Sequence, residues 1–240
     1  MTLDDETNEF AALTASRRST RAFTDQEIPA EVLDAILADA TTAPSWSNTR
    51  AFRLALATGE RAQRLREHYG RLFDEEVEAL ARKSADPEAQ VPLPDGDYPV
   101  RKRYPEEVRP AQIEVAKLLY GIYGVERGDI EGRNRVNRRN VVAFDAPVMG
   151  FVFVHEEMLP WSAMDAGLML QTLFLSAKSR GVDSCPVGIL ATWREPVDAE
   201  FEIPEHYRFI TGFALGYADP EAPINAMKAP RPPIQLLDGK

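Results

Sequence analysis

The chain has 240 residues, with 28 Lys and Arg against 38 Asp and Glu, a formal charge of −10 and 44% apolar residues. This length fits one large domain, and the acidic balance argues against general binding to nucleic acids or anionic membranes, which require a basic surface. No apolar run is long enough to span a bilayer, the acidic first nine residues are unlike a signal peptide, and the single cysteine, Cys185, has no internal disulfide partner, so we expect a cytoplasmic protein.

Apolar periodicity predicts the elements of the first half of the chain. After an acidic N-terminal helix, apolar residues at helical spacing predict a second helix that opens at Pro29. Alternating residues predict a strand over 52–56, and one apolar face predicts a long helix over 60–83. Six prolines in 84–110 then predict a loop excursion, because proline lacks the N–H that a helix or a central strand needs.

The second half is predicted to mix helices and strands around one sheet. The predicted helices are 111–122, 129–142, 161–180 (ended by Gly181) and a short one near 197–203, and the predicted strands are 148–154, 182–190 and 207–217. The last segment, 218–240, has five prolines and little periodicity, which indicates an extended arm. Without strict strand–helix–strand alternation, we expect an α+β class and a single domain over 1–240.

Common catalytic motifs do not occur in the sequence. It contains no Gly-rich dinucleotide fingerprint, no phosphate-binding P-loop, no Gly-x-Ser-x-Gly and no His-Glu-x-x-His. The three histidines, His68, His155 and His206, are far apart and lack ligand spacing, so we expect no metal site.

Four short polar clusters remain as candidate binding segments. The 17–21 cluster, with three arginines and two hydroxyls, suits a phosphate or is a solvated basic turn. The 43–50 cluster, with small polar residues and one aromatic, suits a flat ring or is an ordinary turn. Pro and Gly within 184–188 allow a ligand close to the backbone or mark a bulge, and two cations in 225–231 either complete a phosphate site or are exposed.

In order and spacing, these clusters resemble the FMN-dependent nitroreductase family, and most closely its branch of nitroaromatic-acid (nitrobenzoate) reductases. The resemblance covers residues from about 15 to 235 and is carried by Arg17-Arg18-Ser19-Thr20-Arg21-Ala22-Phe23, Ala43 to Asn48, Asn140 to Pro147, Asp165 with Gly167 and Gln171, Gly181 to Pro186, Gly216 to Pro220, Pro223, Asn225, Lys228 and Arg231. One departure is Thr49-Arg50-Ala51-Phe52, where the family usually has Thr/Ser-Gln-Pro-Trp. Arg50 either favours an anionic substrate or pairs with a surface carboxylate.

The resemblance implies a nitroreductase-like mixed β-sheet flanked by helices, in an interlocked homodimer with FMN at the interface. The arm would wrap the partner subunit, and the 44–48 loop would reach the flavin held by the other subunit. Arg17, Ser19, Arg231, Lys228 and Arg18 would bind the FMN phosphate or ribityl chain, and Arg21 the N1 and C2 carbonyl side of the ring. The remaining implied cofactor-binding residues are Pro186, Val187 and Gly188 beside flavin N5, and Pro44, Ser45, Trp46 and Asn48 from the second subunit.

The implied activity is reduction of a nitroaromatic or quinone-like acceptor by NADH or NADPH in a ping-pong cycle. The flavin N5 would carry the hydride, so no catalytic side chain is expected. The alternatives are a same-scaffold FMN enzyme with other chemistry, such as reductive dehalogenation, or a non-catalytic flavin-binding protein. An acidic interaction scaffold without a cofactor is a further alternative.

Overall fold

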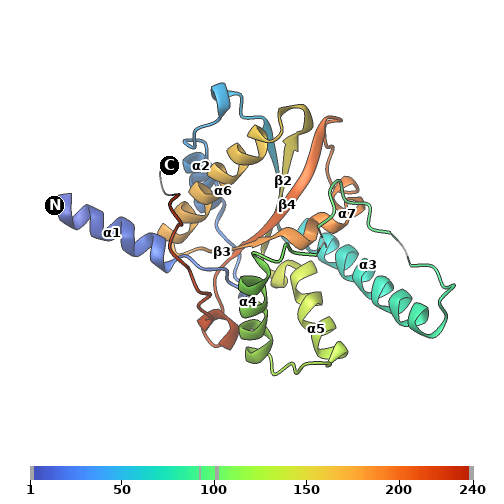
Figure 1. Ribbon diagram of the computed structural model, residues 1–240. Helices are drawn as coiled ribbons and strands as arrows, with labels where there is room; N and C mark the ends of the chain where they lie inside the picture. The colour runs from blue at the N-terminus through green and yellow to red at the C-terminus, as the bar shows by residue number, and fades with distance from the viewer. Residues whose placement is uncertain (1–2, 92, 101–102, 238–240) are drawn as a thin grey trace.

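A computed structural model describes residues 3–91, 93–100 and 103–237 (Figure 1). Its helices are α1 Leu3–Ser16, α2 Ala30–Ala40, α3 Gly59–Ala85, α4 Arg109–Ile122, α5 Ile130–Val141, α6 Trp161–Ser179 and α7 Glu195–Asp198, its strands are β1 Phe52–Ala57, β2 Val148–His155, β3 Asp183–Val187 and β4 Tyr207–Gly216, and its 3-10 turns are η1 Trp46–Asn48, η2 Ala143–Asp145, η3 Glu156–Met158, η4 Gly188–Thr192 and η5 Pro223–Ala226. Within these residues no helix has the length and apolar character required to cross a membrane.

The four strands form one sheet in the order β1-β2-β4-β3, and each neighbouring pair is antiparallel. The outer edge of β3 is extended by Ser19, which forms an isolated parallel bridge to Ser184. Helices packed on a sheet whose neighbouring described strands are all antiparallel confirm the predicted α+β class.

A bulge in β4 lets this strand contribute aromatic rings to both faces of the sheet. Val152 of β2 pairs with Thr211, but the next residue, Phe153, pairs with Phe209, so one residue of β4 is unpaired. The extra residue reverses the alternation of side chains. Phe209 therefore joins the core on one face, whereas Phe213 joins the core on the other.

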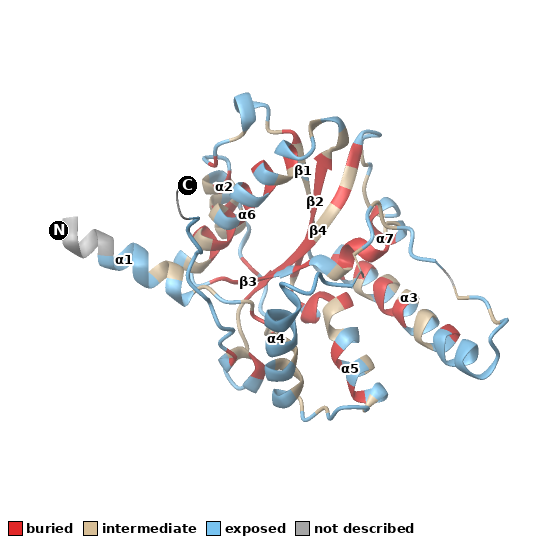
Figure 2. Cartoon of the chain, in the orientation of Figure 1, coloured by how far each residue is buried: buried red, intermediate tan, exposed pale blue. Residues whose placement is uncertain are grey.

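Helices cover both faces of the sheet, and each face has its own hydrophobic core. One core includes residues of α3 and α5, and the other includes residues of α2 and α6. Figure 2 shows buried positions along the strands and on the sides of the helices that face them. Central β2 is buried along nearly its whole length, which explains its unbroken apolar sequence.

Most elements lie where the sequence predicted them, but two predictions are wrong in their bounds. The strand predicted over 182–190 ends at Val187, and the chain continues as η4. Here Leu190 folds over Gly212 of β4 so closely that a Cβ on Gly212 would lie 2.5 Å from its Cδ1. The short helix predicted near 197–203 is Glu195–Asp198 instead, because the distant carboxylate of Asp95 accepts its first N–H groups.

The two proline-rich segments are largely irregular, as predicted. Between α3 and α4 the described residues of the excursion form neither helix nor strand, although both ends of the predicted 84–110 range lie inside those helices. Residues 92, 101 and 102 fall outside the described part of the chain. The arm is described from 218 to 237 and contains η5, while the end of the predicted 218–240 range, 238–240, lies outside the described residues.

Candidate functional site

A cavity of about 720 Å³ lies where the end of α1, the 17–21 segment, the end of α6 and the C-terminal arm meet. Figure 1 shows the arm passing the C-terminal end of α1. Its lining residues are Ala12, Ala15, Ser16, Arg17, Arg18, Ser19, Arg21, Lys178, Met227, Lys228, Ala229 and Arg231. The volume is in the range of protein sites for small molecules and cofactors. Segments more than 200 positions apart in sequence thus form one site.

The cavity is strongly cationic. Six of its described lining side chains are Arg or Lys, and none of the described lining residues is acidic. Of the six, Lys178 already binds a carboxylate, Asp183, with 2.8 Å between its Nζ and Oδ1. Burial and the positive charge of Arg231 lower the pKa of Arg17, because both make its protonated, charged form less favourable. An anion in the cavity would relieve this repulsion and accept charge-assisted hydrogen bonds.

Backbone pairing fixes the 17–21 segment at the edge of the sheet. Thr20 donates its N–H to Ser184 O at 3.0 Å, and Thr24 donates to Tyr217 O at 2.9 Å. These two hydrogen bonds hold a turn in the chain, and the arginines of 17–21 in this turn line the cavity. An edge strand would otherwise expose these backbone groups, so the pairing also completes the sheet.

Asn225 fastens the arm to the same segment. Its Oδ1 accepts the N–H groups of Arg21 at 2.9 Å and Ala22 at 3.2 Å, and its Nδ2 donates to Ala22 O and Asp219 O at 2.8 and 2.9 Å. All the hydrogen-bonding groups of this amide face backbone partners. Further along the arm, the guanidinium of Arg231 donates to the backbone carbonyl of Arg17.

The end of β3 lies next to this segment but does not line the cavity. Val187 is buried, whereas Pro186 and Gly188 are exposed. Cys185 is buried, and burial raises the pKa of its thiol to about 11 despite the nearby Arg21 and Arg17. The predicted burial of Cys185 is therefore confirmed, and the raised pKa is in line with a thiol of low reactivity.

The 44–48 loop lies far from the cavity, at the other end of α6. The N–H of Trp46 donates to both carboxylate oxygens of Asp165 at 3.0 Å, and its indole stacks on that of Trp161 with 4.4 Å between ring centroids. Lys178 follows Asp165 by 13 positions in the same helix, a rise of about 20 Å. One subunit therefore brings together Arg17, Arg18, Ser19, Arg21, Lys228 and Arg231, but not Pro44, Ser45, Trp46 and Asn48.

The loop carries backbone strain. Ser47, Asn48 and Arg50 have φ values of 48°, 56° and 47°, in the left-handed region that L-residues other than Gly rarely adopt. Such strain concentrates at ligand-binding sites, where the surrounding structure maintains it. The N–H of Arg50 donates to Ser45 Oγ at 3.2 Å, and its guanidinium forms no salt bridge with any described carboxylate. The proposed pairing of Arg50 with a surface carboxylate is thus not seen in the described structure.

Four residues of these two regions were given no role by the sequence. Lys178 lines the cavity, Asn225 holds the arm, and Asp165 with Trp161 supports the 44–48 loop. Asp165 and Asn225 belong to the short motifs that carry the family resemblance, so the sequence could have indicated them as functional residues. Lys178 and Trp161 lie in a mostly apolar helix whose contacts depend on tertiary packing.

Comparison with known proteins supports the family resemblance that the motifs indicate. The model of the Nitroreductase family matches residues 14–217. A 4-nitrobenzoate reductase from Pseudomonas putida is 34% identical over 226 residues, covering 94% of this chain and 92% of the relative. A chloronitrobenzene nitroreductase from Comamonas testosteroni is 31% identical over 224 residues, covering 91% of each chain.

Solved structures show the same fold. The FMN and NADPH-dependent nitroreductase NfnB from Sphigopyxis sp. strain HMH has a TM-score of 0.80 at 29% identity, covering 96% of this chain and 99% of that one. The FMN-dependent nitroreductase NfnB from Mycobacterium smegmatis, solved with NADPH, has a TM-score of 0.79 at 26% identity, covering 95% of both chains. These matches confirm the resemblance drawn from the motifs. The chain belongs to the Nitroreductase family.

Proposed function

We propose that the protein is an FMN-dependent oxidoreductase that uses NADH or NADPH to reduce nitroaromatic or quinone-like acceptors in a ping-pong cycle. The observation that carries this proposal is the cationic cavity, because the family's arginine motif and the basic pair of the arm converge there. The names of relatives, among them 4-nitrobenzoate reductase and chloronitrobenzene nitroreductase, support the acceptor class.

The residues of the cavity fit the phosphate end of FMN. Arg17, Arg231 and Lys228 supply donors for a dianionic phosphate, together with the hydroxyl of Ser19, and Arg18 serves the phosphate or the ribityl chain. A single phosphate neutralises part of this charge, which matches a cavity whose described lining contains no carboxylate. When bound, FMN supplies the redox chemistry, and the protein supplies binding, orientation and electrostatics.

Arg21 and the end of β3 are assigned to the ring of the cofactor. Arg21 lines the same cavity, with its backbone N–H held by Asn225 and its guanidinium donating to Ser19 O at 3.2 Å. A fixed cation there favours negative charge on the ring. Pro186, Val187 and Gly188 come shortly after Ser184, whose carbonyl accepts the N–H of Thr20, and so stand where their backbone can approach the ring.

A homodimer is required by this assignment, because Pro44, Ser45, Trp46 and Asn48 are distant from their own subunit's cavity. We infer that they contact the cofactor held by the partner. An exposed apolar stripe on α6 supports this, since Trp161, Met164 and Leu168 are 41–48% exposed beside an equally exposed Trp46. The arm supports it too, with Ile234, Leu236 and Leu237 88–97% exposed. Covering such residues would require the arm to wrap the partner chain.

We also infer that the chain is a single domain with a cytoplasmic location. Both hydrophobic cores use the same sheet, which supports one folding unit across the 84–110 excursion. The reduced, buried Cys185 and the acidic composition are consistent with a reducing compartment and with no nucleic-acid partner.

The proposed function is tested by spectroscopy and turnover on the purified protein. We expect flavin absorption bands that bleach on addition of NADH or NADPH without oxygen. Steady oxidation of the reductant should then follow when a nitroaromatic such as 4-nitrobenzoate is added. Bleaching without turnover would indicate a flavin-binding protein or another acceptor chemistry. A colourless protein that FMN does not reconstitute would contradict the proposal.

A further inference from the structure

The 84–110 excursion is fastened to the segment after β3 by three consecutive residues, Asp95, Gly96 and Asp97, which we call the clamp. The carboxylate of Asp95 accepts the N–H groups of Arg194 and Glu195, each at 2.8 Å. Gly96 donates its N–H to Thr192 O at 3.1 Å. The approach is so close that a Cβ on Gly96 would meet Ala191 O at 2.1 Å, so no other residue fits there without movement.

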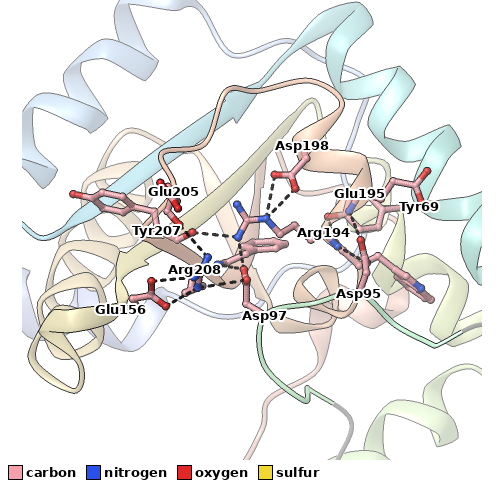
Figure 3. A network of polar contacts seen from close by, with 12 residues as sticks. Tyr69, Asp95, Asp97, Glu156, Arg194, Glu195, Asp198, Glu205, Tyr207 and Arg208 are labelled. Atoms are coloured by element: carbon pink, nitrogen blue, oxygen red, sulfur yellow. Dashed lines mark hydrogen bonds and ion pairs between the residues drawn. The ribbon is translucent and has the colours of Figure 1, made fainter.

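Asp97 lies at the centre of a polar network, shown in Figure 3. Its Oδ2 accepts from Arg194 Nη1 at 2.6 Å and from the N–H of Phe209 at 2.7 Å. The side chains of Asp97 and Arg194 are only 12% and 15% exposed, so the two charges form a largely desolvated ion pair. The same guanidinium also binds Asp198 and the carbonyl of Tyr207.

The clamp therefore holds one end of η4, the turn that begins at Gly188. At its start η4 is continuous with β3, where Val187 pairs with Gly212 of β4. At its end, Thr192 is held by Gly96, and the next residues by Asp95 and Asp97. No side chain caps this short 3-10 turn from within. Its position relative to the sheet thus depends on the clamp at this end, together with the packing of Leu190 against Gly212.

We propose that Asp97 is a positioning residue for the redox reaction: through Arg194 and the N–H of Phe209 it locks the excursion onto 188–195 and so sets the position of Gly188. This inference rests on the proposed function, in which Gly188 lies beside the reactive part of the flavin. Asp97 itself touches neither cofactor nor substrate. The excursion then holds this part of the site in position. Its irregular, proline-rich chain brings the three residues of the clamp to the segment after β3.

Hydrogen–deuterium exchange on the full-length protein tests the positioning part without reference to the cofactor. Asp97→Asn removes one of the two carboxylate charges that hold Arg194, the other being that of Asp198, and Asp95→Asn weakens the other half of the clamp. Because each variant loses the negative charge that strengthens its hydrogen bonds, we expect exchange over 189–193 to rise about tenfold or more. The matched control is Asp74→Asn, which removes a carboxylate bound side-on by Arg138 between α3 and α5.

The inference is overturned if 189–193 exchanges as in the unaltered protein in both clamp variants, or if Asp74→Asn accelerates it equally. In the FMN-loaded protein, we expect Asp97→Asn to lower kcat and the rate of flavin bleaching about tenfold, with the Kd for FMN unchanged. A variant that merely loses thermal stability, with kcat and flavin spectrum intact below its Tm, contradicts the catalytic part. Failure of the unaltered protein to bind FMN would instead overturn the proposed function, and the exchange data would still decide whether Asp97 holds η4.

Discussion

The guanidinium of Arg231 donates a hydrogen bond to the backbone carbonyl of Arg17, a residue 214 positions earlier in the chain. The contact joins the arm to the 17–21 segment and places two like charges in one cavity. Like charges at short range destabilise the folded protein unless an anion or carboxylate lies between them. The repulsion is therefore a local marker of an anionic ligand in a chain with a net charge of −10.

Lys178 and Asp183 should have opposite effects on FMN binding. The ammonium of Lys178 lines the cavity but is partly neutralised by Asp183 at 2.8 Å. Lys178→Met should weaken FMN binding by a few-fold. Asp183→Asn should strengthen FMN binding at low salt by about 1 kcal/mol, because the ammonium of Lys178 is then no longer neutralised by a carboxylate. Fluorescence titration with FMN in low and high salt measures both. Equal effects of the two variants would contradict the placement of Lys178 at the phosphate.

Asn225→Ala should release the arm from the 17–21 segment. The variant loses hydrogen bonds to Arg21, Ala22 and Asp219 and leaves backbone groups without these partners. We expect a loss of about 1–3 kcal/mol in the free energy of unfolding, with weaker FMN binding. Urea unfolding followed by circular dichroism measures the first. The control Asn8→Ala changes an exposed asparagine of α1 and should leave the free energy of unfolding unchanged.

Cys185 should make stability fall at high pH. Its thiol has a pKa near 9 when unfolded, and burial raises the pKa to about 11 in the folded protein. The unfolded chain thus loses this proton first, so the contribution is complete below pH 9 and is lost as the pH rises toward 11. The total is about 2–3 kcal/mol.

Urea unfolding between pH 8 and 11 measures this effect of Cys185. Cys185→Ala should remove this part of the pH dependence, and in the native protein a thiol reagent at pH 8 should react slowly. Rapid labelling of the native thiol would contradict the assigned burial.

Mixed dimers should reveal that the 44–48 loop acts across the interface. One subunit carries Arg17→Ala with Arg231→Ala, and its partner carries Trp46→Ala with Asn48→Ala. If the loop serves the partner's cavity, one site of the mixed dimer carries both lesions and the other carries none, so flavin binding and turnover persist at one site. If the loop served its own subunit, each site would carry one lesion and both would fail. Each homodimer of variants is the control.

Local sequence patterns predict most of the helices and strands, and the remaining element bounds depend on tertiary contacts. The apolar run of β2 and the amphipathic face of α3 are visible in the sequence because burial fixes their periodicity. The start of α7 is not visible, because Asp95, about 100 positions away, binds its first N–H groups. The turn at Gly188 is equally hidden, since it depends on Leu190 packing over Gly212.

The residues of the candidate site divide in the same way, into those that local motifs indicate and those that only tertiary packing reveals. Arg17, Arg21 and Arg231 stand in motifs whose charge is unusual in an acidic chain, so the sequence indicated them, and they converge in one cavity. Lys178 could not be found this way, because it lies in an apolar helix and reaches the cavity only through the packing of α6 on α1. The distance between the cavity and the 44–48 loop likewise emerges only in three dimensions.

The proposed function depends on the cavity holding the phosphate of FMN. Calorimetric titration of the unaltered protein and of the Arg17→Ala, Arg231→Ala double variant with FMN and with riboflavin, which lacks the phosphate, tests it most directly. We expect FMN to bind the unaltered protein at least about 100-fold more tightly than riboflavin, and the double variant to lose this difference while remaining a dimer. Equal affinity of the unaltered protein for FMN and riboflavin, or tight retention of FMN by the double variant, would contradict it.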